Sequence, residues 1–127
     1  MKKKEVLRGV RRFRNIVMFG ERFDGDLVRV FCMFCRNGGV AFRVGVAVRH
    51  KVGRAVQRSR LRRLMREAIS RERTSLVNIL EKAQLHASVV FLFVGIKDLA
   101  IEHVTLRLLQ EDIGMVCRTL MKRVAAG

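Results

Sequence analysis

Arginine side chains are concentrated in one stretch of this 127-residue chain, from Arg49 to Arg66. The stretch holds eight basic residues and His50, but no acidic residue. Solvated helix faces normally interleave acids with bases, because like charges four residues apart on a helix repel each other by a few tenths of a kcal/mol. A bound polyanion would offset that repulsion. The stretch therefore predicts a helix that binds nucleic acid rather than one that only faces solvent.

The second half of this stretch has the periodicity of an amphipathic helix. Its apolar side chains recur at the spacing of one helix face, which places inward Leu61, Leu64, Met65, Ala68 and Ile69. The arginines of the same segment fall on the remaining arc and are expected on the outside: Arg58, Arg60, Arg62, Arg63 and Arg66. One helix would thus pack against the core and present cations to a partner.

Two strands are predicted ahead of this helix, at 27–34 and 40–48, and the Asn37-Gly38-Gly39 turn between them indicates a hairpin. Alternate side chains of a strand face opposite ways, so one face of the pair is apolar and belongs to the core. The other face mixes an aromatic ring, cations and small residues: Arg29, Phe31, Met33, Ala41, Arg43, Gly45, Ala47 and Arg49. Such a face suits single-stranded nucleic acid, whose bases stack and whose phosphates pair with cations. A merely half-exposed antiparallel face would give the same pattern.

The rest of the chain completes an α+β pattern. A first helix should end near Gly20 and carry Val10, Phe13 and Val17 on one face, and a turn should follow at 21–26. Further predicted elements are a continuation of the arginine helix through 74–85, a central strand at 87–96 buried on both faces, and a helix at 105–124. The predicted order, α-β-β-α-β-α, is a single-domain sandwich spanning residues 1–127, with a flexible basic arm at 1–8.

Charge and composition narrow the class of protein. The net charge is +16, and residues 27–66 contribute eleven basic residues and no acid, so the middle of the chain should face the partner. A hydrophobic content of 50% is too high for a disordered basic tail. Three cysteines without framework spacing, Cys32, Cys35 and Cys117, predict reduced thiols in a cytoplasmic protein. The longest apolar run, 89–96, is too short to span a bilayer.

The segment from Arg43 to Ala68 resembles the bacterial ribonuclease P protein component. The shared pattern is a strand that ends in two basic residues, here His50 and Lys51, followed by a glycine and an Arg-Asn-Arg helix. This chain has Ser59 in place of the family's asparagine, which keeps a donor and an acceptor but loses the planar amide. A weaker resemblance covers nearly the whole chain.

The resemblance implies a protein cofactor of a ribozyme. In that family the RNA subunit removes the 5′ leader of precursor tRNA by Mg²⁺-dependent hydrolysis, leaving a 5′-phosphate. The metal is held mainly by RNA, and none is expected to bind tightly to the protein. The resemblance also implies an unusual left-handed β-α-β crossover around the arginine helix, and no obligate protein partner.

Two sets of site residues follow from position in the family pattern. The surface for the catalytic RNA would comprise His50, Lys51, Arg54, Arg58, Ser59, Arg60, Arg62, Arg63 and Arg66. The cleft for the leader would comprise Phe13, Val17, Phe31, Ala47 and Arg49, to which the sheet-face pattern adds Arg29.

Three other functions compete with this interpretation: a general RNA- or DNA-binding module of ribosomal type, a membrane-surface protein, and a nuclease that acts alone. The helix lacks the interfacial aromatics of a membrane binder. No catalytic acid/base pair is apparent, because Glu111 and Asp112 are adjacent and point apart on a helix. Cys32 and Cys35 lie three residues apart on a strand and face opposite ways, so a zinc or redox role is not expected.

Overall fold

The computed structural model describes residues 6–7, 9–36, 39–95 and 99–127. Helix α1 (Val10–Phe19) is followed by strands β1 (Glu21–Asp24), β2 (Val28–Cys35) and β3 (Phe42–Val48). Helix α2 (Ala55–Lys82), strand β4 (His86–Phe93) and helix α3 (Leu106–Ala125) complete the chain, with short 3-10 turns at His50–Val52 and Ile101–His103. The predicted α+β class is confirmed.

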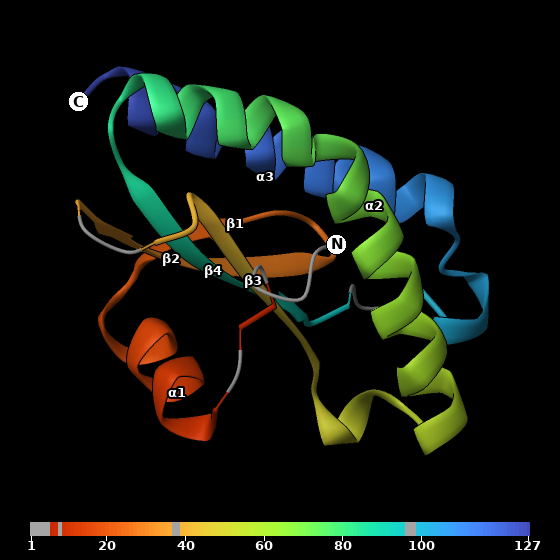
Figure 1. The fold of residues 1–127 in the computed structure, drawn as a ribbon. Coiled ribbons are helices and arrows are strands. Elements are labelled where there is room, and N and C mark those ends of the chain that lie inside the picture. Colours follow the sequence, from red (N-terminus) through yellow and green to blue (C-terminus); the bar gives the residue numbers. More distant parts are fainter. Residues whose placement is uncertain (1–5, 8, 37–38, 96–98) are drawn as a thin grey trace.

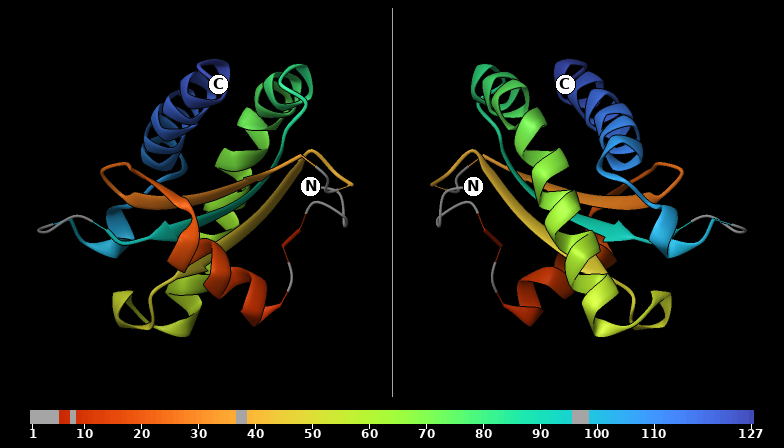
Figure 2. Two further views of the ribbon diagram at one scale, coloured as in Figure 1. Left: turned by 90° about the vertical axis from the view of Figure 1, so that its left-hand side faces the viewer. Right: turned by 90° about the vertical axis from the view of Figure 1, so that its right-hand side faces the viewer.

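The four strands form one sheet in the order β1-β2-β4-β3. Strand β4 pairs antiparallel with β2 and parallel with β3, so it is hydrogen bonded along both edges. Its side chains Val89, Val90 and Phe91 are fully buried, which confirms the predicted central strand. Helices α2 and α3 cover one face of the sheet and α1 lies against the other (Figures 1 and 2).

The predicted hairpin is wrong, because β4 lies between β2 and β3. An apolar strand that can be buried on both faces is more stable in the middle of the sheet than at its edge, and this preference overrides the local turn signal. Residues 37 and 38 of that turn lie outside the described residues. The predicted turn at 21–26 is also too long, since Glu21–Asp24 forms an edge strand against β2.

Strand β3, helix α2 and strand β4 form the crossover between the two parallel strands. Viewed from the side of α2 with both strands pointing upward, β4 lies to the left of β3, so the crossover is left-handed (Figure 2). This arrangement departs from the usual right-handed rule, as the family resemblance implied. Helix α2 is continuous over 28 residues, about 42 Å at 1.5 Å per residue.

The main core lies between the sheet and helices α2 and α3. From α2 it takes Leu61, Met65, Ala68 and Ile69, as predicted, and Leu76 and Leu80 from the second half of the helix. Leu64, also predicted to face inward, is only partly buried at the margin of this core, so the centre of the apolar stripe lies nearer Leu61 and Met65. Helix α3 contributes Leu109, Ile113, Val116, Cys117, Leu120 and Val124.

Asp112 ties α3 to the turn between β1 and β2, a contact that the sequence did not reveal. Its buried carboxylate accepts hydrogen bonds from the backbone N–H groups of Asp26, Leu27 and Val28, at 2.6, 2.8 and 3.0 Å. Gly25 leaves room for it, because a Cβ there would lie 2.5 Å from a carboxylate oxygen. The carboxylate therefore replaces the partners that these backbone groups would otherwise find in water.

We expect Asp112→Ala to lower the free energy of unfolding by about 2–4 kcal/mol, because three backbone donors lose their charged acceptor. Urea denaturation followed by circular dichroism would measure the change. Glu111→Ala, at the exposed neighbouring position, should cost less than about 0.5 kcal/mol. Similar losses in the two variants would contradict the role assigned to the carboxylate.

Candidate RNA-binding surfaces

The sheet face opposite α2 and α3 carries three of the predicted leader residues, Arg29, Phe31 and Ala47, but it is not fully open. Helix α1 packs on it through Ile16, which forms a small buried cluster with Leu7 and Val90. Phe13 and Phe31 are partly buried against this cluster. Phe31 is thus a support for α1 as well as a candidate stacking surface, which corrects the expectation of an open platform.

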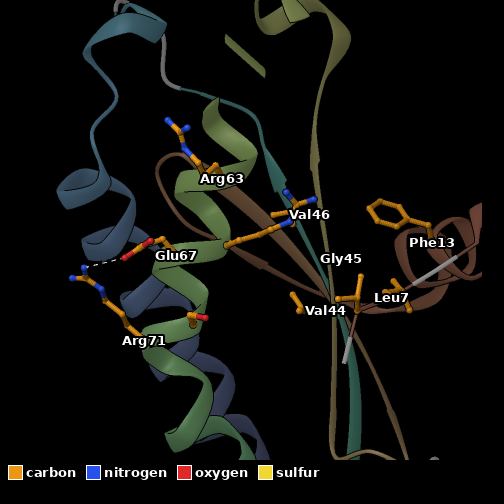
Figure 3. Close-up of a pocket in the computed structure, with 11 residues that line it drawn as sticks. Leu7, Phe13, Val44, Gly45, Val46, Arg63, Glu67 and Arg71 are labelled. Carbon is orange, nitrogen blue, oxygen red and sulfur yellow. Dashed lines mark hydrogen bonds and ion pairs between the residues drawn. The ribbon is translucent and has the colours of Figure 1, made fainter. Parts of the chain in front are cut away.

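Gly45 sets the distance between α1 and the sheet. A Cβ at this position would lie 2.6 Å from Cε2 of the Phe13 ring and 3.2 Å from Cδ2 of Leu7. The space that the small residue leaves is therefore filled by protein side chains, not kept clear for a base. Gly45 therefore lies on the predicted sheet face, but its small size makes room for α1 and not for an RNA base (Figure 3).

The open part of this face is the row of residues beside α1. The strand register places Arg29 of β2, Leu92 of β4 and Ala47 of β3 next to one another. Leu92 is half-buried and was missed, because β4 was read as buried on both faces. Alternation along β4 gives the signal that could have found it, since Ser88, Val90 and Leu92 share one face.

Two predicted leader residues that lie outside the strands are exposed. Val17 on α1 keeps 36% of its surface exposed, and Arg49 is exposed just after β3. Nε of Arg29 lies 3.4 Å from Oδ1 of Asp24, so the two side chains form an ion pair. A hydrogen bond from the Arg22 guanidinium lowers the pKa of Asp24, so this carboxylate is charged at neutral pH and offsets part of the Arg29 charge. The strongest free cation at the row is therefore Arg49.

The start of α2 divides the predicted RNA-subunit residues into two groups. Arg58 and Arg60 are half-buried and bond to backbone carbonyls, which corrects the expectation that all five arginines lie outside. The Arg58 guanidinium donates to the carbonyls of Gly53 and His50, and Arg60 donates to the carbonyl of Val104 at 2.8 Å. These two side chains hold the turn before α2 and the segment before α3.

The other predicted residues present their polar groups to solvent. Arg62 donates to the Ser59 hydroxyl at 3.1 Å, so this serine orients a neighbouring cation. The exposed members of the set are His50, Lys51, Arg54, Ser59, Arg63 and Arg66. They follow one path from the turn after β3 along α2, and their contacts with RNA remain predictions.

The cysteines and the remaining histidines offer little chemistry. Cys32 and Cys117 are buried, and burial raises the pKa of both thiols, that of Cys117 to about 12. Cys35 is exposed and not in a disulfide. His86 is half-buried, with Nδ1 2.8 Å from the carbonyl oxygen of Val40. Within the described ranges, no three acidic, histidine or cysteine side chains cluster as a metal site, and no helix could cross a membrane.

Together, the fold and its two cationic surfaces define a small basic α+β protein suited to binding a polyanion. The family model for ribonuclease P matches residues 1–112, and the chain belongs to this family. It functions as the protein component of ribonuclease P, in tRNA 5′ processing. No comparison supports the alternative of a general RNA-binding protein.

Individual relatives agree with this assignment. The chain is 35% identical over 85 residues to the ribonuclease P protein component of Clostridium novyi, covering 67% of this chain and 73% of that one. It is 37% identical over 65 residues to the component from Dictyoglomus thermophilum, over about half of each chain (51% and 52%). The Thermotoga maritima protein superimposes with a TM-score of 0.65 at 25% identity, covering 90% of this chain and 96% of that one. The Staphylococcus aureus protein, at 20% identity and a TM-score of 0.64 over 91% and 94% of the chains, supports the fold.

The two groups of arginines should respond differently to truncation. Arg60→Ala leaves the Val104 carbonyl without its partner and should lower the free energy of unfolding by about 1 kcal/mol. Arg63→Ala, one exposed residue along the same helix, should leave stability within about 0.5 kcal/mol of the parent. Thermal unfolding of the two variants compares them directly. A stability loss confined to Arg63→Ala would reverse the assignment.

Proposed function

We propose that the protein joins two RNAs, the catalytic RNA of ribonuclease P and the 5′ leader of precursor tRNA. The exposed residues of the turn at 50–53 and of α2 would bind the catalytic RNA. The row beside α1, formed by Arg29, Leu92 and Ala47 with Val17 and Arg49, would hold the leader. The observation that carries the proposal is this pair of surfaces, which differ in chemistry and meet at the turn after β3.

The chemistry of each surface fits its proposed partner. The leader row combines apolar surface for bases with a cation at its end, as single-stranded RNA requires. The α2 surface offers guanidinium groups with few apolar neighbours, which suits the phosphates of a folded RNA. Protein cations brought to a ribozyme and its substrate also lower the repulsion between two polyanions, and with it the metal concentration needed to screen them.

In this scheme the RNA carries the catalysis. Mg²⁺, held mainly by RNA, would activate the hydrolysis that yields a 5′-phosphate on the tRNA. The protein's residues orient the leader and neutralise charge. We also place the protein in the cytoplasm with its tRNA substrate, where three cysteines outside disulfides are chemically stable.

The overall proposal is tested by adding the protein to a ribonuclease P RNA and measuring leader removal at low Mg²⁺. Stimulated cleavage is expected, since the protein supplies cations that metal would otherwise provide. Unchanged cleavage, with no binding to either RNA, would refute the assignment of partners.

The leader row is tested with Arg49→Ala. This variant should weaken holoenzyme binding to a precursor tRNA that carries a leader and reduce the magnitude of the slope of log affinity against log salt by about 0.7, one phosphate contact on a single strand. Binding to tRNA without a leader should not change. Arg118→Ala, on α3 across the sheet, is the matched control and should leave both affinities unaltered (Figure 2). Equal losses for the two substrates would show that this row does not contact the leader.

A further inference from the structure

The open row beside α1 continues onto the edge strand β1, where it ends in an acid. The strand register pairs Asp24 of β1 with Arg29 of β2. It also pairs Arg29 with Leu92 of β4 and Leu92 with Ala47 of β3, so one line of side chains crosses the sheet. Residues directly opposite each other on neighbouring strands share one face of the sheet. Three strand spacings of about 4.8 Å separate Asp24 from Ala47, so the row is about 14 Å wide.

Two guanidinium groups surround the Asp24 carboxylate. Arg22 donates hydrogen bonds from Nε and Nη2 to both carboxylate oxygens, at 3.0 to 3.2 Å. Nε of Arg29, the other half of the cluster, is buried and makes no hydrogen bond to any described residue, but it lies within ion-pair distance of Asp24. The side chains of Arg22 and Asp24 are each about half exposed (50% and 51%), so an RNA strand in the row can reach them.

This cluster changes the charge that RNA meets at the β1 end of the row. An exposed ion pair contributes little to folding stability, so its larger effect is on an approaching anion. Two arginines and one aspartate leave a net charge of +1, with the negative charge placed between the two cations. At the other end, Arg49 is exposed and forms no ion pair with any described residue. A phosphate is therefore attracted to the Arg49 end and meets a carboxylate at the β1 end.

We propose that Asp24 is a specificity-determining residue that ends the phosphate path of the leader. Its carboxylate binds Arg22 and Arg29 in the place of an RNA phosphate, so the leader makes its charge contact near Arg49 and leaves the sheet before β1. Longer leaders then bind no better than leaders that just fill the row, because the nucleotides that reach β1 add no phosphate contact. The inference rests on the proposed function, since it sets a limit to the leader contact assigned to this face.

The test is Asp24→Asn, which removes the charge but keeps the shape of the side chain and one oxygen acceptor for Arg22. Glu111→Gln is the matched control, because Glu111 is also an exposed acid paired with an arginine, Arg107 at 3.4 Å, and lies on α3 across the sheet (Figure 2). Both variants gain one positive charge, so a general effect of net charge appears in both. Thermal unfolding checks that both fold as the parent does.

Holoenzymes with each protein are compared for binding to leaderless tRNA and to precursor tRNAs whose leaders lengthen one nucleotide at a time, over a salt series. The parent and Glu111→Gln should reach a constant affinity at one leader length. Asp24→Asn should gain further with longer leaders, by about two- to five-fold, the effect of one exposed ion pair. The magnitude of its slope of log affinity against log salt should rise by about 0.7 with these leaders. Its affinity for leaderless tRNA should not change.

The inference is overturned if Asp24→Asn matches Glu111→Gln at every leader length, or if it gains equally without a leader. Failure of the proposed function has a different signature, because the parent itself would then bind leader-bearing and leaderless tRNA equally. A parent whose affinity depends on the leader, together with an unaltered Asp24→Asn, rejects the inference alone.

Discussion

The burial of β4 on both faces is the constraint from which the rest of the structure follows. A strand with fully buried Val89, Val90 and Phe91 needs hydrogen-bonded neighbours on both edges and a cover on both sides. Strands β2 and β3 are these neighbours, although they are consecutive in the chain and the sequence between them favours a hairpin. Helices α2 and α3 supply one cover and α1 the other. The left-handed crossover and the position of the open row beside α1 are consequences of this central placement.

Helix α2 meets two demands that compete for the same residues. Its apolar stripe fills the core, and the arginines around that stripe are divided between holding the protein together and facing outward. Arg58 and Arg60 bond to carbonyls in the segments before α2 and before α3, whereas Arg63 and Arg66 remain exposed. Some of the charge that marks this helix in the sequence is therefore structural, and a count of arginines overstates the surface available to RNA.

Hydrophobic periodicity predicted the elements that bury one continuous apolar stripe or a continuous apolar run. The apolar stripes of α2 and α3 and the continuous apolar run of β4 each have one packing solution, so their positions agreed with the structure. Strand β1 was missed, because a four-residue edge strand, Glu-Arg-Phe-Asp, has almost no apolar signal. The hairpin was wrong because pairing is decided by long-range burial. The role of Asp112 could not be predicted, since its partners lie about 85 residues away in sequence. At the candidate sites, the sequence predicted which helix or strand carries each residue, and the RNA contacts stay predictions. The cover provided by α1 and the inward bonds of Arg58 and Arg60 were missed, because they depend on tertiary contacts.

The outer edge of β3 has a consequence for how the protein behaves before it meets RNA. An edge strand with apolar side chains can pair with the same edge of another molecule, which leads to aggregation. Among the described residues, the N-terminal segment bridges this edge at Val44, and Phe13 and Leu7 lie at one side. Arginines of α2 line a cleft beside this edge (Figure 3), so two copies that approach edge to edge bring cationic helices together. Repulsion between these charges opposes such pairing of the unbound protein, and high salt, which screens them, weakens this protection.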